Sequence, residues 1–270
     1  NREAGTSPEV YICSTETRVV PLSHYAYLTI PQSNLKQMSD GDKLKYKGIF
    51  NKLQLLKGPE TNEAFHQPKY EQIRKTMTFL EKQRKRINKY FVLNELVSML
   101  KNKQLLPAIV FVFSRKQVDI LATKVQHTLH DDDTKMSSTV EKECEGLLKS
   151  KLPNWKEYTV LPEYITLINL LKKGIAVHHA GILKEFREMV ELLFDKGYIK
   201  LLFATETFAV GINMPTRTTV FTSLEKFDGT GFRYLKPSEY TQMAGRAGRR
   251  GIDIKGTVIH MNNLFDKNNI

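Results

Sequence analysis

Gln242, Arg246 and Arg249 are spaced by four and then three residues in the stretch QMAGRAGRRG, from Gln242 to Gly251. Ser238, four residues earlier, is a residue type that caps helix N-termini, so we predict a helix that starts there and runs through the stretch. At 3.6 residues per turn the three side chains would then share one face. Two guanidiniums and an amide suit a triphosphate, because arginine presents planar, forked donors to phosphate oxygens.

Two glycines, Gly245 and Gly248, flank the arginines of this stretch. Each glycine in a helix interior lowers helix stability by about 1 kcal/mol relative to alanine, which suggests that the two glycines serve another purpose. A missing side chain lets either a phosphate or another backbone come close. Residue chemistry alone leaves both interpretations open: a phosphate-binding face, or a basic helix that packs tightly through its glycines.

The elements that must position these residues are short apolar runs alternating with amphipathic helical segments. This texture predicts an α/β fold, a parallel sheet covered by helices on both faces. The predicted strands are 107–113, 174–180, 198–205, 217–223 and 256–261. We assign residues 69–270 to this domain, with an exposed helical insertion around 125–160, and residues 1–68 to an N-terminal appendage or linker.

In such a sheet, ligands bind beyond the carboxyl ends of the strands. Three segments follow a predicted strand directly: Ser114–Arg115, His178–Gly181 and Thr205–Glu206. Hydroxyl and backbone N–H groups at such positions are typical donors to nucleic-acid phosphates. Glu206 repels phosphate, so its predicted partner is a sugar hydroxyl, a base or an arginine.

A metal site is not expected at the paired histidines, His178 and His179. Successive residues of a strand point to opposite faces, which keeps the two rings from sharing one ion. A polar loop at a nucleic-acid surface fits better. For one of the pair, a buried and hydrogen-bonded histidine is the alternative.

The composition favours a polyanionic partner without identifying it. The 270 residues carry a formal net charge of +12, which attracts nucleic acid but also suits an acidic membrane surface or simple solubility. No apolar run approaches the roughly 20 residues that span a bilayer, so we expect no membrane segment. Two distant cysteines, Cys13 and Cys144, fit a reducing, intracellular compartment, nuclear or cytoplasmic.

Several nucleotide-binding motifs are missing from the sequence. It has no Gly-x-x-x-x-Gly-Lys-Ser/Thr phosphate loop, no Gly-x-Gly-x-x-Gly loop, and no acidic pair at a strand end to hold Mg²⁺. An arginine face without a phosphate loop is half of a nucleotide site.

Four segments, FVFSRK, HHAG, FATETFAVGINMP and QMAGRAGRRG, occur in this order along the chain. In order and spacing they resemble the later motifs of superfamily-two helicases, and more narrowly the superkiller-like, exosome-associated DExH-box RNA helicases. The ending AGRRG, with Arg250 where splicing and DNA-repair relatives typically have proline, is the best pointer to that branch. The resemblance implies the second RecA-like lobe of a motor that uses ATP to move 3′ to 5′ along single-stranded RNA.

The nucleotide-site residues follow from this resemblance. It implies that Gln242, Arg246 and Arg249 contact ATP, the two arginines at the γ-phosphate, and that Gly211 and Asn213 line the nucleotide side of the cleft. Mg²⁺ would be held by the first RecA-like lobe of the same protein. We therefore expect the 270 residues alone to be inactive in ATP hydrolysis.

The RNA-facing residues implied by the resemblance are Ser114, Arg115, His179, Thr205 and Glu206. Such backbone contacts position a strand without reading its sequence, so a weak sequence preference is expected. The RNA exosome is a candidate partner. Two other functions stay open: a non-catalytic nucleic-acid-binding module that has kept a helicase-like fold, and a lobe of a DNA helicase.

Overall fold

The computed structural model describes residues 18–60, 63–83, 87–130, 135–209 and 214–264. The strands are β1 (Leu22–Leu28), β2 (Lys52–Lys57), β3 (Ala108–Phe111), β4 (Ile175–His178), β5 (Leu201–Ala204), β6 (Thr218–Phe221), β7 (Glu225–Phe227), β8 (Phe232–Tyr234) and β9 (Gly256–Met261). The helices are α1 (Gln32–Lys36), α2 (Asp40–Lys45), α3 (Gln67–Lys82), α4 (Lys89–Asn102), α5 (Arg115–Lys124), α6 (Met136–Lys151), α7 (Trp155–Thr159), α8 (Pro162–Leu171), α9 (Lys184–Asp195), α10 (Pro237–Ala244) and the 3-10 turn η1 (Glu206–Ala209).

A seven-stranded sheet in the order β2-β1-β9-β6-β3-β5-β4 forms the centre of the molecule. Every neighbouring pair is parallel except β1 and β2, which run antiparallel. Each of the five predicted apolar runs contains one of these strands. All four residues of β3, β4, β5 and β6 are buried, which explains their unbroken apolar character. The predicted α/β fold is confirmed.

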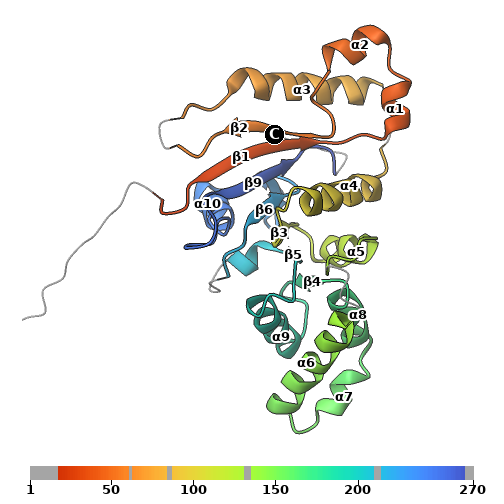
Figure 1. Cartoon of the computed structure of the whole chain (residues 1–270), viewed down its shortest axis with the longest axis vertical. Helices are drawn as coiled ribbons and strands as arrows, with labels where there is room; N and C mark the ends of the chain where they lie inside the picture. Colours follow the sequence, from red (N-terminus) through yellow and green to blue (C-terminus); the bar gives the residue numbers. More distant parts are fainter. Residues whose placement is uncertain (1–17, 61–62, 84–86, 131–134, 210–213, 265–270) are drawn as a thin grey trace, which may run out of the picture.

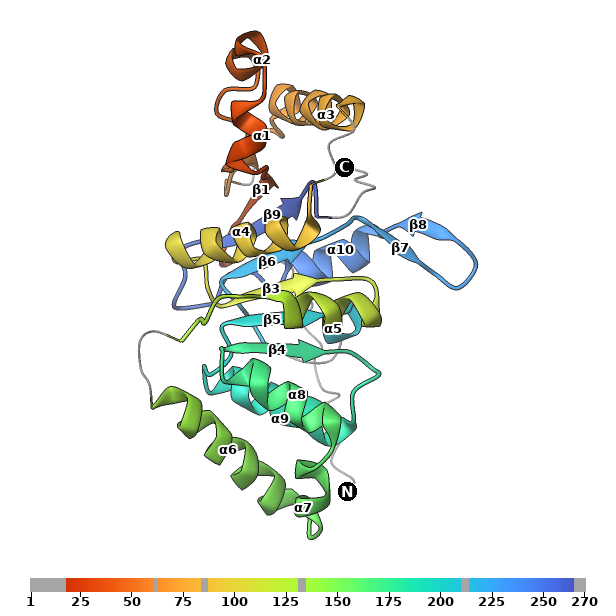
Figure 2. The ribbon, with the colours of Figure 1, turned by 90° about the vertical axis from the view of Figure 1, so that its right-hand side faces the viewer.

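Helices cover both faces of the sheet: α4 and α5 lie on one side, and α9 and α10 on the other (Figure 1). The apolar spacing of α9 shows why it packs there. Phe186, Met189, Val190 and Leu193 recur three to four residues apart and are all buried, so α9 presents one apolar face to the sheet. Figure 2 looks onto the face of the sheet that carries α4 and α5, and both helices lie in front of the strands and run roughly along them.

The predicted N-terminal appendage needs correction, because part of it belongs to the sheet. β1 pairs in parallel with β9 over six residues, from Leu22 opposite Gly256 to Tyr27 opposite Met261, and β2 extends the sheet beyond β1. A second apolar cluster joins Leu28 and Ile49 to Ile73 and Met77 of α3. Strand pairing and packing thus cross the predicted boundary at residue 68. β2 and the short helices α1 and α2 were not predicted, because the segment after β1 is polar and shows little apolar periodicity.

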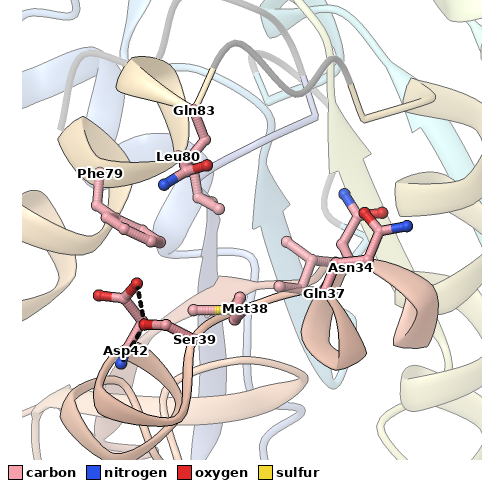
Figure 3. A pocket seen from close by; sticks show the side chains of 9 residues that line it. Asn34, Gln37, Met38, Ser39, Asp42, Phe79, Leu80 and Gln83 are labelled. Atoms are coloured by element: carbon pink, nitrogen blue, oxygen red, sulfur yellow. Dashed lines mark hydrogen bonds between the residues drawn. The ribbon is translucent and has the colours of Figure 1, made fainter.

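A small pocket of about 180 Å³ opens between α1, α2 and the end of α3 (Figure 3). Met38, Phe79 and Leu80 form its apolar wall. On its rim the Ser39 hydroxyl donates to Asp42 Oδ2 at 2.7 Å and accepts from the Asp42 backbone N–H at 3.1 Å. This reciprocal pair caps the N-terminus of α2 and fixes its start.

The region predicted as an exposed helical insertion around 125–160 contains the helices α6 and α7, but one face of α6 is buried. Val140, Cys144 and Leu148 of α6 belong to the main core, and α6 packs against α8 and α9. Burial raises the pKa of the Cys144 thiol to about 12, so this cysteine is a core residue and not a nucleophile. No helix in the described part of the chain has the length and apolar character of a membrane span.

A two-stranded hairpin, β7–β8, was not predicted. Its turn is built by Asp228, whose Oδ1 accepts from the backbone N–H groups of Thr230 and Gly231. Gly229, between Asp228 and Thr230, adopts φ +106°. The dipeptide Asp-Gly between two aromatic-rich runs was the available sequence signal. The hairpin leads directly into α10.

Candidate functional site

The three predicted strand-end segments come together because β3, β5 and β4 are neighbours in one parallel sheet. The backbone N–H of Thr205 donates to the carbonyl of His178 at 3.3 Å, which joins the segments after β5 and β4. Arg115, at the start of α5, lies beside Gly181 of the segment after β4: a Cβ atom added to Gly181 would be 3.6 Å from Arg115 Cδ. The fold therefore gathers residues that are up to 92 positions apart along the chain (Ser114 to Glu206).

The N-terminus of α5 is exposed and carries positive charge. Ser114 caps the helix by accepting the Gln117 backbone N–H at 3.4 Å. Arg115 and Lys116 follow in the first turn, and both are exposed. Free backbone N–H groups and cations at one helix end form a suitable phosphate-binding surface.

His178 and His179 point to opposite sides of the sheet, as predicted, and each binds a different carboxylate. His178 Nε2 lies 2.8 Å from Glu191 Oε1 on α9, and His179 Nε2 lies 3.0 Å from Asp119 Oδ1 on α5. His179 Nδ1 accepts the Gly181 backbone N–H at 3.1 Å, so its Nε2 carries the proton toward Asp119. At 3% and 5% exposure, both histidines are buried. His179 thus supports the loop from below instead of presenting its ring at the surface.

Thr205 and Glu206 have partners of their own within the lobe. The Thr205 side chain is buried and its hydroxyl lies 2.9 Å from that of Thr207. The Glu206 carboxylate binds Lys226 Nζ at 3.2 Å, and Lys226 also binds Glu239 at 2.9 Å. Burial lowers the pKa of Lys226, but the hydrogen bonds to Glu239 and Glu206 outweigh it, and the net shift is upward. Glu206 therefore holds a lysine of the hairpin, where the sequence left a sugar, a base or an arginine open.

The predicted helix through Gln242, Arg246 and Arg249 is wrong beyond Ala244. The helix α10 begins at Pro237, its N-cap is Lys236 and not Ser238, and it ends at Ala244. Gln242 lies on its exposed last turn, whereas both arginines lie in the turn that follows. The three side chains therefore do not form one helical face. Tertiary hydrogen bonds override the helical spacing here.

The turn after α10 packs onto the amino-terminal ends of β6 and β9. Gly248 adopts φ +87°, and a Cβ there would lie 2.5 Å from Val20 Cγ1 and 3.1 Å from the backbone of Gly256. Arg18 ties the same turn down by donating to the carbonyls of Gly245 and Ala247, at 2.6 and 2.7 Å. Of the two interpretations of these glycines, the structure supports close backbone packing for Gly248.

The two candidate arginines have different partners. The Arg246 guanidinium donates to the carbonyl of Ala209 at the end of η1, and within the described residues no carboxylate pairs with it. Arg249 is held by Asp253: its Nε donates to Oδ2 at 2.8 Å and its Nη2 to Oδ1 at 3.0 Å. The other two predicted nucleotide residues, Gly211 and Asn213, lie outside the described residues.

Asp253 and Arg217 are functional candidates that the sequence analysis missed. Asp253 also accepts Arg217 Nε at 2.9 Å, so one carboxylate bridges two arginines. Burial disfavours the charged carboxylate, but hydrogen bonds from Arg249 and Arg217 outweigh it and hold the pKa of Asp253 well below its ordinary value. The spacing of four residues between Arg249 and Asp253 was a usable signal, because it is typical of ion pairs.

The chain is similar to known helicases, both in one conserved domain and over longer stretches of sequence. Residues 153–251 match the helicase conserved C-terminal domain. The chain is 48% identical over 170 residues to the antiviral helicase SKI2 of Saccharomyces cerevisiae, covering 62% of this chain and 13% of that protein. It is 37% identical over 273 residues to human superkiller complex protein 2, covering 93% and 20%. With human exosome RNA helicase MTR4, the identity is 44% over 170 residues, covering 62% and 16%.

These relatives are much longer than the present chain, which spans between 13% and 20% of their lengths. The similarity to human superkiller complex protein 2 covers nearly all of the 270 residues. The matched range contains β4, β5 and residues 245–251, the turn that carries Arg246 and Arg249 and is named the arginine turn, but not the strand-end segment at Ser114.

Proposed function

Since the chain belongs to the C-terminal lobes of superkiller-like helicases in superfamily two, we propose that it is the second motor lobe of an ATP-dependent RNA helicase that moves 3′ to 5′. The main support for a nucleotide site in this lobe is the environment of the Arg246 side chain. Its guanidinium is partly buried, and among the described residues its hydrogen-bond partner is the Ala209 carbonyl. A partly buried cation that has no carboxylate partner within the described part of the chain is typical of an anion site.

ATP binds at the turn that follows α10. Arg246 and Arg249 face the γ-phosphate, where an arginine in other nucleotide hydrolases stabilises developing charge and contributes roughly 10³–10⁵ in rate. Gln242 supplies an amide from the exposed last turn of α10. Gly211 and Asn213 complete this side of the cleft. A first RecA-like lobe of the same protein supplies the phosphate loop and the acidic residues that hold Mg²⁺.

RNA lies across the carboxyl ends of β3, β4 and β5. Ser114 and Arg115 contact phosphates at the exposed start of α5, where backbone N–H groups and a guanidinium point outward. Thr205 and its neighbouring backbone contribute from the end of β5. His179 acts through the loop it supports, and Glu206 acts by holding Lys226. These groups read the backbone and not the bases, which predicts weak sequence preference.

ATP and RNA then work together through lobe closure. ATP between the lobes brings both onto the RNA phosphates, and hydrolysis loosens one grip so that the strand advances. The names of the relatives make the RNA exosome a candidate partner in an intracellular setting. The 270 residues on their own bind RNA but do not turn over ATP.

The test uses the full-length protein on duplexes with a single-stranded overhang. We expect ATP-dependent unwinding of RNA duplexes with a 3′ overhang and little unwinding with a 5′ overhang. Equal or better unwinding of the matching DNA duplexes would assign the lobe to a DNA helicase. RNA binding without ATP turnover in the full-length protein would identify a non-catalytic module.

A further inference from the structure

Arg249 meets Asp253 side-on, and this geometry leaves part of its guanidinium unused. The pair consumes the Nε hydrogen and one Nη2 hydrogen, on the two carboxylate oxygens at 2.8 and 3.0 Å. A guanidinium has five N–H donors in a fixed plane. Within the described ranges, both Nη1 hydrogens and the second Nη2 hydrogen therefore remain without a partner, and they lie on the edge that points away from the carboxylate. That edge matches two phosphate oxygens.

Asp253 is held in place independently of the Arg249 side chain. Its side chain is 3% exposed. Oδ1 accepts Arg217 Nε at 2.9 Å, and Oδ2 accepts the Arg249 backbone N–H at 3.0 Å. Arg217 is fixed in turn by donating to the carbonyl of Gln104 at 2.7 Å. The carboxylate is thus anchored between the start of β6 and the arginine turn.

From this arrangement we propose that Asp253 is a positioning residue for Arg249: it orients the guanidinium so that the Nη1–Nη2 edge faces the transferring phosphate. The inference rests on the proposed function, in which Arg249 acts at the γ-phosphate. Arginine carries many rotamers, and a side chain already ordered loses less freedom when it meets the transition state. Asp253 itself touches neither nucleotide nor RNA.

A purely structural ion pair is the competing explanation, and its effects are different. A structural pair stabilises the fold and leaves the turnover of the folded enzyme unchanged. A positioning pair lowers kcat when broken, and its loss matters only while Arg249 is an arginine. The two explanations separate when turnover and stability are measured on the same variants.

The experiment compares Asp253→Asn with wild type in the full-length protein, under conditions where thermal unfolding shows both to be folded. Asparagine keeps the shape but removes the charge and one acceptor. We expect kcat for RNA-stimulated ATP hydrolysis to fall roughly 10- to 100-fold, the range seen when an outer-shell partner of a metal ligand is lost. KM for ATP and the affinity for RNA should change much less. Asp253→Glu, which keeps the charge but displaces it, serves if the asparagine variant does not fold.

A matched control is Glu188→Gln, which breaks another two-cation carboxylate cluster in the same lobe. Glu188 binds Lys151 at 2.6 Å and Lys184 at 3.6 Å, on α9 and away from both proposed binding surfaces. We expect this variant to keep kcat within about twofold, in line with the small effect of surface substitutions.

The outcomes distinguish this inference from the proposed function. On an Arg249→Lys background, Asp253→Asn should cause little further loss of kcat, because lysine cannot form the side-on pair. Wild-type kcat in both Asp253 variants, or an equal loss with and without Arg249, would overturn the positioning role alone. If Arg249→Ala itself kept full turnover, the proposed role of Arg249 would fail first, and this inference with it.

Discussion

Thr216 and Ala247 pair as neighbours in a parallel bridge, at the point where the chain leaves α10. The Thr216 N–H donates to the carbonyl of Arg246 at 2.8 Å, and the Gly248 N–H donates to the carbonyl of Thr216 at 2.7 Å. These bonds replace the helical ones that Arg246 and Gly248 would otherwise make. The arginine turn is therefore fixed to the start of β6, as one rigid unit with the sheet.

Gly248→Ala should destabilise the lobe strongly. The φ of +87° costs a non-glycine residue about 1–2 kcal/mol, and the new methyl group, 2.5 Å from Val20 Cγ1, adds about 1–3 kcal/mol of overpacking. Gly251→Ala is the matched control, because Gly251 also has positive φ, +75°, but has no atom within 4 Å of the added Cβ. Chemical denaturation of the three proteins measures the difference, and equal losses in the two variants would show that Gly248 is not needed for close packing.

A partly buried group of three stacked rings, His24, Tyr240 and His260, predicts acid sensitivity. Tyr240 OH lies 2.8 Å from His24 Nδ1 and 3.1 Å from His260 Nε2. Burial, helped by Lys57, lowers the pKa of His24 to about 4, and burial lowers that of His260 to about 3. Unfolded histidine titrates near pH 6.5, so the unfolded chain binds these protons first as the pH falls.

The contribution of these two histidines to the free energy of unfolding should accordingly be constant above about pH 6.5. Below pH 6.5 it should decrease by about 1.4 kcal/mol per pH unit for each histidine, until the pKa values of the folded state are reached. His260→Phe keeps a stacking ring and removes one titrating group. Between pH 6 and 4.5 the free energy of unfolding of this variant should therefore fall less steeply than that of wild type, by the contribution of one histidine. Urea unfolding at several pH values measures this. Parallel curves for the two proteins would contradict the assignment.

Arg115→Ala should weaken RNA binding without changing the fold. Arg115 is exposed at the N-terminus of α5, so its loss removes one phosphate contact and no core packing. For a single-stranded contact, the slope of log K against log salt should drop by about 0.7. Lys124→Ala removes the same charge at the far end of the same helix and should keep the wild-type slope. An unchanged slope in Arg115→Ala would remove α5 from the RNA path.

The sequence predicted the central sheet well because its strands are buried on both faces. Val110, Phe203 and Val220 lie in runs whose apolar character leaves no other placement. The prediction from sequence failed where tertiary contacts outweigh the local spacing of residues. Gln242, Arg246 and Arg249 have helical spacing, yet the bridge between Thr216 and Ala247 ends the helix. No local sequence pattern indicates that Ala247 pairs with Thr216, 31 residues earlier.

The candidate site was predictable in its residue types but not in its partners. The strand-end rule correctly grouped Ser114, His179 and Thr205. It could not foresee that the ring of His179 is turned inward to Asp119, or that Glu206 is paired with Lys226. Such pairings depend on which helix packs over which strand end, and the sequence alone does not set that arrangement.

The most direct test of the central claim is ATP turnover by the full-length protein carrying Arg249→Ala, measured alongside its affinity for single-stranded RNA. Turnover should fall at least about 10³-fold, while RNA affinity stays within a few-fold of wild type. The neighbouring Arg250→Ala is the matched control, since Arg250 is exposed beside the same turn, and it should retain turnover. Wild-type turnover in Arg249→Ala would contradict the assignment of this lobe to the γ-phosphate side of an ATP site.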